Sequence, residues 1–421
     1  MGNPASRQLP TSVKIYSNNK EGFISLLQRI GMLPSDIMQS RDQFERDIRS
    51  SNLFKDDVGA MIDLVVLGTC EVDMDNLGPD LLKAWDERPL DKKFMLVCIV
   101  HNGHTTDWFG DIAEWSRRSA FRVVPISDHV ADYFRDMFNI WAESKDPAER
   151  LSLYEYIQVD PHYSISNFTN FPLKPKTYLA DVPCSAALQG TYQQMRRDYA
   201  RVFKDLSRLL REDPRGWGYQ WNTRERKYDV DKTAPHPPFV LHLVGSGEMT
   251  VPTELQDVVV KDINLDAVSF YKLIQSMDII VPSFSVRGGY LFHQASSTVH
   301  TAVMNRVPLL VTRPMLKAYP FLTAEGTILR PMALSEMEAI GLFRGAKVTA
   351  EVTGREVPEG AVKPPFRFND LSAAEMPPKL AGDVKMMLDR GWKRSDEGFE
   401  RLTREIWEKN ENFVGRLLRD L

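Results

Sequence analysis

The sequence predicts an α/β protein with two domains in series, each built around a parallel β-sheet. Three observations predict this class. The chain has 421 residues, and at roughly 100–200 residues per domain two domains are expected. Short runs of apolar and β-branched residues, bounded by polar residues, are typical of buried strands. These runs alternate with helical patterns, which favours parallel sheets covered by helices on both faces.

The first half contains four predicted strands with helical patterns between them. Trp108, Ile112 and Trp115 lie at helical spacing within a helix predicted over 107–120. Ser127 stands in the N-cap position of a second helix, predicted over 128–141. The predicted strands cover residues 12–16, 62–67, 94–100 and 121–126.

The second half repeats this rhythm. Strands are predicted over residues 185–188, 239–244, 258–261, 278–281 and 307–312, and helices over 191–211, 270–277 and 297–306. Two stretches lack apolar periodicity. Residues 214–238 are predicted to be a long surface insertion, and residues 348–378 are similarly irregular.

The chain divides at the proline-containing stretch 160–181. We expect an N-terminal domain over 1–165, a C-terminal domain over 182–395 and a terminal helix over 396–421. An apolar stripe on that helix must pack against something, and the helix could dock across both domains. The stripe consists of Phe399, Leu402, Ile406, Phe413, Leu417 and Leu421.

Composition excludes several classes of protein. The net charge of −4 provides no basic footprint for nucleic acid. No run of about 18 apolar residues predicts a transmembrane helix, and the N-terminus lacks the apolar core of a secretory signal. Cys70, Cys98 and Cys184 are scattered and outside any metal spacing, so we expect buried free thiols in a reducing compartment. A cytoplasmic protein is predicted, with weak membrane association as an alternative because Gly2 fits an N-myristoylation pattern.

Candidate ligand-binding residues lie where predicted strands end, because the carboxyl ends of parallel strands form the ligand crevice. Gly245, Ser246 and Gly247 directly follow the strand over 239–244. Their small size allows close approach of a ligand, although a tight turn would need glycines equally.

A second group of candidates surrounds the start of the helix predicted over 297–306. Free backbone N–H groups and hydroxyls there suit a phosphate, whereas a simple cap would need only one hydroxyl. The preceding loop is cationic, and Arg196 and Arg197 follow Gly190 elsewhere in the same domain. These residues could neutralise a diphosphate or could simply be surface residues. The hydroxyl and loop candidates are Ser296, Ser297, Thr298, Arg287, Gly288 and Gly289.

In the first half, His101 ends the strand over 94–100, and Glu71 follows another strand. A histidine at this position could bind a sugar hydroxyl or act as a base, or it could be an ordinary loop residue. Glu71 is the weaker candidate. The sequence contains no zinc pattern, P-loop or nucleophile elbow, so no metal site is predicted.

These motifs together resemble the glycosyltransferases of the GT-B fold. Residues 239–312 are similar to their donor-binding domain, and residues 293–308 keep the spacing of a pattern in nucleotide-sugar transferases. Val97–His101 followed by Pro125-Ile126-Ser127 is similar to retaining family 4 members. The whole chain resembles a little-studied fungal group related to families 4 and 1.

The resemblance implies two Rossmann-like parallel-sheet domains facing a central cleft. It implies transfer of a hexose from a UDP- or GDP-sugar to a hydroxyl acceptor, without a metal or other cofactor. His101 and Glu71 would be the catalytic residues. The donor would be bound by Gly190, Arg196, Gly245, Ser246, Gly247, Arg287, Gly288, Gly289, His293, Ser296, Ser297 and Thr298.

The chain also departs from the family pattern. His293 and Thr301 stand where family 4 members usually carry two glutamates, and Arg306 stands where a glycine is usual. Two alternatives therefore stay open. One is a nucleotide-sugar epimerase on the same scaffold, which needs no acceptor, and the other is a non-catalytic GT-B-like binding protein.

Overall fold

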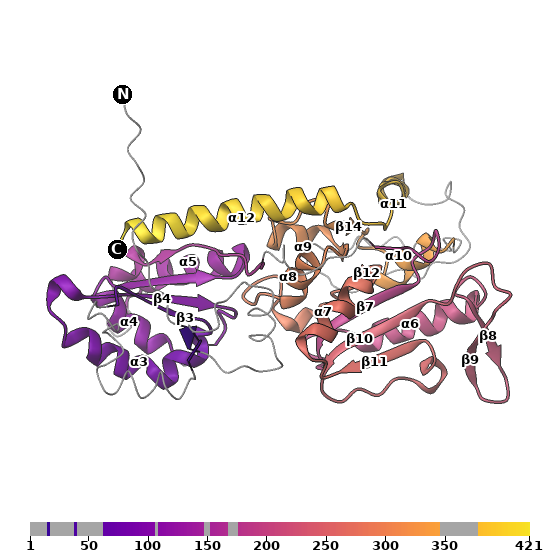
Figure 1. Ribbon diagram of the computed structural model, residues 1–421, viewed down its shortest axis with the longest axis horizontal. Helices are drawn as coiled ribbons and strands as arrows, with labels where there is room; N and C mark the ends of the chain where they lie inside the picture. The colour runs from indigo at the N-terminus through magenta and orange to yellow at the C-terminus, as the bar shows by residue number, and fades with distance from the viewer. Residues whose placement is uncertain are drawn as a thin grey trace, which may run out of the picture.

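The computed structural model describes residues 15–16, 38–39, 62–105, 108–146, 152–166, 176–345 and 378–421. Two parallel sheets, of four and six strands, form two α/β units that lie side by side (Figure 1). We call residues 62–166 the N-terminal unit and residues 176–395 the C-terminal unit. The predicted fold class, two Rossmann-like domains with parallel sheets, is confirmed.

The N-terminal unit follows the simplest parallel order, in which each strand pairs with the next along the chain. Three helices connect the strands, and Trp108, Trp115 and Phe134 are fully buried in the core between helices and sheet. The strands are β3 (Leu64–Leu67), β4 (Met95–Val100), β5 (Phe121–Pro125) and β6 (Gln158–Val159). The helices are α3 (Cys70–Asp86), α4 (Phe109–Arg117) and α5 (Asp128–Ala142). A separate parallel pair joins β1 (Ile15–Tyr16) and β2 (Met38–Gln39).

The strands of the C-terminal sheet have the order β11-β10-β7-β12-β13-β14. After β7 the chain adds β10 and β11 on one side, and then adds β12, β13 and β14 on the other side, so the strand order reverses between β7 and β12. Its strands are β7 (Ser185–Thr191), β10 (Val240–Ser246), β11 (Val259–Ile263), β12 (Ile279–Ile280), β13 (Leu309–Val311) and β14 (Thr327–Leu329). Its helices are α6 (Tyr199–Glu212), α7 (Ala267–Ser276), α8 (Ser297–Met304), α9 (Arg313–Ala318), α10 (Glu336–Phe343) and α11 (Pro378–Arg390). Ligands of such sheets bind outside the strand ends where the order reverses.

The stretch 214–238 is an insertion between α6 and β10 that lies mostly at the surface, as the sequence predicted, but it is not irregular throughout. It folds into an antiparallel hairpin of β8 (Tyr219–Asn222) and β9 (Lys227–Val230). Trp217, Tyr219 and Tyr228 are buried in the main core of the C-terminal unit. The burial of these three aromatic residues was not predicted from the sequence, because their spacing matches neither a helix nor a long strand.

Helix α6 begins later than the sequence predicted. The apolar pattern suggested a start near Thr191, whereas the helix starts at Tyr199. The Asp198 side chain caps it by accepting a hydrogen bond from the Arg201 backbone N–H at 3.2 Å. Arg197 meanwhile forms an isolated antiparallel bridge with Phe284. The backbone before Asp198 therefore pairs with the segment that follows β12, and the helix cannot extend into it.

The expectation of three free thiols is wrong for two of the cysteines. Cys70 and Cys98 form a disulfide with a Cα–Cα distance of 5.2 Å, while Cys184 is free and buried. The parallel register of the sheet explains the pairing, since Leu67 at the end of β3 lies opposite Cys98 on β4. Cys70, three residues after Leu67, starts α3 and turns back over the neighbouring strand.

Helix α12 (Asp396–Arg419) runs along both units (Figure 1). Phe399, Leu402 and Ile406 pack into the core of the C-terminal unit. Phe413 and Leu417 pack on the sheet of the N-terminal unit. Ion pairs reinforce the two ends, joining Arg306 to Glu400 and Arg122 to Asp420. Five residues of the predicted stripe thus hold the two units together, whereas Leu421 is 50% exposed and lies beyond the end of α12.

Among the residues that the structure describes, no helix combines the length and apolarity needed to cross a bilayer. The Gly2 motif and nearly all of the irregular stretch 348–378 lie outside the described residues. The first residues of the strand predicted over 12–16 also lie outside them.

Candidate functional site

The carboxyl ends of β7 and β10 lie against each other in the C-terminal sheet. Gly190 pairs with Gly245, and Thr191 pairs with Ser246. A Cβ atom at Gly245 would stand only 2.0 Å from the Gly190 carbonyl oxygen. Gly245 is therefore required by the close approach of two strands, independently of any ligand. Gly247, exposed with a φ of 105°, lets the chain leave the sheet.

The dominant feature of this edge is the guanidinium of Arg197, which is 3% exposed. It donates from Nη2 to the Thr298 hydroxyl at 2.7 Å and from Nη1 to the Pro282 carbonyl. A Cβ atom at Gly190, whose φ is 137°, would lie 2.9 Å from Nη2. The guanidinium thus fills the space where the end of β7, the end of β12 and the start of α8 converge.

Arg197 forms no ion pair with any acid that the structure describes. Its charge interacts with the phenol groups of Tyr199, Tyr290 and Tyr319, and its Cζ lies 5.6 Å from the centre of the Phe284 ring. Burial lowers the pKa of the Arg197 guanidinium, although an arginine stays protonated in proteins. The site is therefore a buried positive charge with no acid paired to it among the described residues.

The other predicted cations lie outside this convergence. Arg196 and Arg287 are exposed, and the hydrogen bonds of Arg196 to the described residues use its backbone. Gly288 approaches the Arg196 backbone closely, which explains its small size. The sequence analysis selected Arg196 as the donor-binding residue, whereas the arginine that fills this edge is its neighbour Arg197, because the choice between them depends on the path of the loop before α6. No pattern in the sequence distinguishes the two.

The three hydroxyls at the start of α8 have different environments. The Thr298 hydroxyl accepts from Arg197 and donates to the Gln189 carbonyl at 3.1 Å. Ser296 is the buried N-cap residue but makes no capping hydrogen bond with its side chain. Ser297 is exposed. Only Thr298 is in contact with the buried guanidinium.

His101 and Glu71 lie together at the carboxyl edge of the N-terminal sheet. The Glu71 carboxylate accepts from the backbone N–H groups of His101 and Asn102 at 2.5 and 2.6 Å. The His101 ring places Nε2 3.0 Å from the Gly68 carbonyl oxygen, so a neutral ring donates from Nε2 and leaves Nδ1 as an acceptor. Glu71 thus holds the backbone around His101.

This edge is joined to the segment that enters α8. The Ala295 N–H donates to the His101 carbonyl at 2.9 Å, and the Gly103 N–H donates to the His293 carbonyl at 2.7 Å. The His293 ring lies 4.8 Å from the ring of His104 and 3.3 Å from the Asn102 amide oxygen. Burial, and then the neighbouring histidines, lower the pKa of His293. A Cβ atom at Gly289 would collide with the His293 ring, so the glycine makes room for the ring.

Two further histidines connect the units, and sequence reasoning did not select either as a site residue. His129 places its ring nitrogens 2.8 and 3.0 Å from the carbonyl oxygens of Ala318 and Gln294. His300 places its own 3.2 and 3.0 Å from those of Ser296 and Ile126. Burial lowers the pKa of His129 and lowers that of His300 to about 4. Both rings are thus neutral at pH 7, and each then donates from one nitrogen to one of its two carbonyl oxygens.

No protein-family model and no curated protein matches the sequence. Among solved structures, the chain is similar to TarM, with 10% identity, coverage of 82% of this chain and 52% of that one, and a TM-score of 0.38. It is similar to sucrose-phosphate synthase from Thermosynechococcus elongatus, with 11% identity, coverage of 92% and 81%, and a TM-score of 0.44. It is also similar to α,α-trehalose 6-phosphate synthase from Burkholderia multivorans, with 10% identity, coverage of 91% and 78%, and a TM-score of 0.40. The chain thus spans about half the length of TarM.

Proposed function

We propose that the protein is a glycosyltransferase that moves a hexose from a nucleotide diphosphate sugar to a hydroxyl acceptor. The observation that carries this proposal is the buried guanidinium of Arg197 at the start of α8. A buried charge without an opposite charge is costly, and a bound anion would offset that cost. The N-terminus of α8 adds its own positive potential and free N–H groups.

The chemistry that this site favours is departure of a diphosphate. In the proposed reaction the anomeric C–O bond to the diphosphate breaks, and a bond from the acceptor oxygen to the anomeric carbon forms. Negative charge develops on the leaving diphosphate, and Arg197 with the α8 N–H groups would stabilise it. Stabilisation of the leaving group by these residues needs no metal ion. A UDP- or GDP-sugar would be the donor.

His101 is positioned to act on the sugar side of the reaction. Its carbonyl is bonded to Ala295, which directly precedes the N-cap of α8, so its ring belongs to the same junction. The proposed role is contact with the donor hexose or acceptance of the acceptor proton at Nδ1. His293 and Thr301, which replace the usual glutamates, would give the donor a different set of hydrogen bonds.

A calorimetric titration with a UDP-hexose and a GDP-hexose tests the binding half of the proposal. We expect saturable binding of one of them, with a dissociation constant below about 1 mM. Release of nucleotide diphosphate in the presence of an acceptor panel then tests transfer. No binding of either donor at millimolar concentration contradicts the proposal. Conversion of donor alone into an isomeric sugar would instead identify an epimerase.

A further inference from the structure

The disulfide lies directly beside the residues that join the two units. Cys70 is the first residue of α3 and is followed by Glu71, while Cys98 lies on β4, the strand that leads into His101. Both cysteines are fully buried. The disulfide therefore links the turn that carries Glu71 to the strand that carries His101.

Hydrogen bonds continue from this turn to the loop that follows β4. Oε1 of Glu71 accepts from the backbone N–H groups of His101 and Asn102 at 2.5 and 2.6 Å. The other carboxylate oxygen, Oε2, is buried and has no hydrogen-bond partner among the described residues. The His101 ring in turn lies 3.0 Å from the carbonyl oxygen of Gly68. The position of the turn thus determines the position of residues 101–102.

The same loop is bonded to the C-terminal unit. The His101 carbonyl accepts from the Ala295 N–H at 2.9 Å, and the Gly103 N–H donates to the His293 carbonyl at 2.7 Å. Ala295 directly precedes the N-cap residue of α8. A continuous series of bonds therefore runs from the disulfide through Glu71 to the start of α8.

The two ends of the disulfide are held with unequal strength. Cys98 lies in the interior of its sheet, where β4 is paired with both β3 and β5. Gly68 and Thr69, before Cys70, are exposed, and the hydrogen bonds of Thr69 run within α3 itself. Two thiols repel each other at the distance of an S–S bond, so reduction increases the separation of the two sulfur atoms. The more weakly held end, Cys70, is the end that moves, and Glu71 moves with it.

We propose that the Cys70–Cys98 disulfide is a redox-sensitive lock on the junction between the two units. In the oxidised protein the lock holds the Glu71 carboxylate against the N–H groups of His101 and Asn102. A thiol reductant breaks the S–S bond by supplying two electrons, each cysteine sulfur takes up a proton, and the reductant becomes a disulfide. The start of α3 then shifts and releases the two N–H groups.

The buried position of the sulfur atoms makes the lock slow to respond rather than inert. A reductant reaches them when the first turn of α3 opens locally, next to the exposed Gly68 and Thr69. The lock itself does not require the transfer reaction. Only its effect on the donor rests on the proposed function, because the bonds that it controls end at the start of α8.

Amide hydrogen exchange of the full chain, measured before and after reduction with dithiothreitol, tests the proposal. We expect the amides of His101 and Asn102 to exchange about tenfold faster after reduction, since each loses a hydrogen bond to a charged acceptor. The amide of Phe134, on α5 of the same unit, should not change. Alkylation of the unfolded chain with iodoacetamide should modify only Cys184 before reduction and all three cysteines after it.

Cysteine variants separate the disulfide from other effects of the reductant. In Cys70→Ala the amides of His101 and Asn102 should exchange as fast as in the reduced wild type, with or without dithiothreitol. Cys184→Ala, the matched control, keeps the disulfide and should respond to reduction like the wild type. Thermal unfolding checks that each variant is folded.

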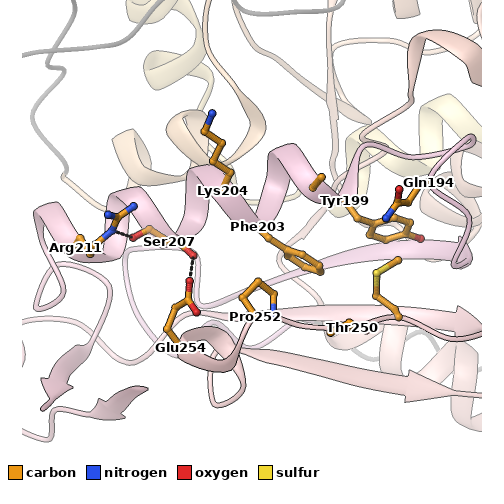
Figure 2. Close-up of a pocket in the computed structure, with 11 residues that line it drawn as sticks. Gln194, Tyr199, Phe203, Lys204, Ser207, Arg211, Thr250, Pro252 and Glu254 are labelled. Carbon is orange, nitrogen blue, oxygen red and sulfur yellow. Dashed lines mark hydrogen bonds between the residues drawn. The ribbon is translucent and has the colours of Figure 1, made fainter. Parts of the chain in front are cut away.

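A second pair of variants tests whether Glu71 transmits the change. In Glu71→Ala the two amides should exchange rapidly before reduction, and reduction should alter their rates by less than about twofold, because the connecting carboxylate is already absent. Glu254→Ala is the control. Glu254 lies beside α6, where its carboxylate accepts from the Ser207 hydroxyl (Figure 2), and its removal should leave the response to reduction unchanged.

Three results overturn the proposal. One is equal exchange of His101 and Asn102 before and after reduction, and another is alkylation of all three cysteines in the unreduced chain. The third is equal acceleration at Phe134, which would mean that reduction loosens the whole N-terminal unit. Failure of UDP- and GDP-hexose to bind changes none of these readouts, so that result contradicts the proposed function alone.

Discussion

The two sheet edges that meet at the junction each bury a charge, and they treat it in opposite ways. At the N-terminal edge, the Glu71 carboxylate is 7% exposed and is bonded to two backbone N–H groups of the adjoining strand end. At the C-terminal edge, the Arg197 guanidinium is 3% exposed and bonded to a carbonyl and a hydroxyl. Neither charge is paired with an opposite charge among the described residues.

The two charges differ in which segments of the chain contain their hydrogen-bond partners. Both partners of Glu71 lie in one loop, so its carboxylate fixes the shape of that loop around His101. The partners of Arg197 come from β12 and α8, with Gly190 of β7 beside them, so three segments converge on the cation. A helix N-terminus adds positive potential there. Under the proposed function, Glu71 positions the loop and Arg197 binds the diphosphate of the donor.

The largest expected effect comes from removing the Arg197 charge. Arg197→Met keeps the volume of the side chain but removes the cation, so we expect the affinity for a nucleotide diphosphate to fall about 100-fold, as for a lost hydrogen bond to a charged group. Arg197→Lys keeps the positive charge but cannot make two parallel hydrogen bonds, so its affinity for a nucleotide diphosphate should lie between those of the wild type and Arg197→Met. Calorimetry with UDP and GDP measures the change.

The matched control for Arg197 is its neighbour. Arg196→Met changes an exposed arginine one residue away and should leave affinity within about twofold. Thermal unfolding separates a misfolded Arg197→Met from a folded protein that does not bind. Wild-type affinity in a folded Arg197→Met would remove the basis of the proposed function.

The second effect concerns acid and the link that His300 makes between the edges. Its pKa is about 4 in the folded protein, because burial disfavours the cation, against 6.5 in the unfolded chain. Above pH 6.5 neither state binds the proton. Below pH 6.5 the unfolded chain binds it first, so the free energy of unfolding falls as the pH drops toward 4, by about 3 kcal/mol in total.

Urea unfolding at pH 7, 5 and 4 measures this loss. His300→Gln keeps a donor and an acceptor but does not titrate, so its stability should fall less over the same pH range. His236→Gln, in the segment before β10, is the control and should retain the wild-type slope. Equal slopes for wild type and His300→Gln would show that His300 does not cause the acid sensitivity.

Much of the fold could be predicted because strands buried on both faces have a strong local signature. The predicted strand over 94–100 becomes Met95–Val100, and the stripe from Phe399 to Leu417 becomes α12. Elements without such a signature were missed. Helix α3 contains Gly78 and Pro79 in its interior, and the hairpin of β8 and β9 depends on aromatic residues that only the tertiary fold brings into the core.

The candidate site was predictable only in outline. The strand ends identified His101 in the N-terminal sheet and Gly190 and Gly245 in the C-terminal sheet, because the carboxyl ends of parallel strands share one edge of their sheet. The side chain that fills the edge, Arg197, depends on the irregular path of residues 191–198, which has no periodic signal. The disulfide between Cys70 and Cys98 was missed for a similar reason, since it depends on which strands are neighbours.

A smaller effect tests the positioning role of Glu71. Glu71→Ala removes the acceptor of two N–H groups, so we expect a loss of about 1–3 kcal/mol in stability and a fall of about tenfold in kcat through displacement of His101. The donor dissociation constant should stay within about twofold. Glu71→Gln retains an acceptor oxygen and should recover part of both losses, whereas Asp91→Ala, an exposed acid of the same unit, should change neither. A changed donor affinity with unchanged kcat would place Glu71 at the donor instead.

The smallest effect concerns the pair of rings at the junction itself. His104 lies 4.8 Å from His293 and lowers its pKa, because two nearby imidazoles disfavour each other's cations. His104→Gln should therefore raise the pKa of His293, which an NMR titration of the imidazole C–H signals detects. The pKa should stay below 6.5, since burial is the larger cause and is unchanged by this substitution. An unchanged pKa would mean that the rings are further apart in solution, and that the junction between the two edges is looser than the backbone hydrogen bonds of His293 and Ala295 require.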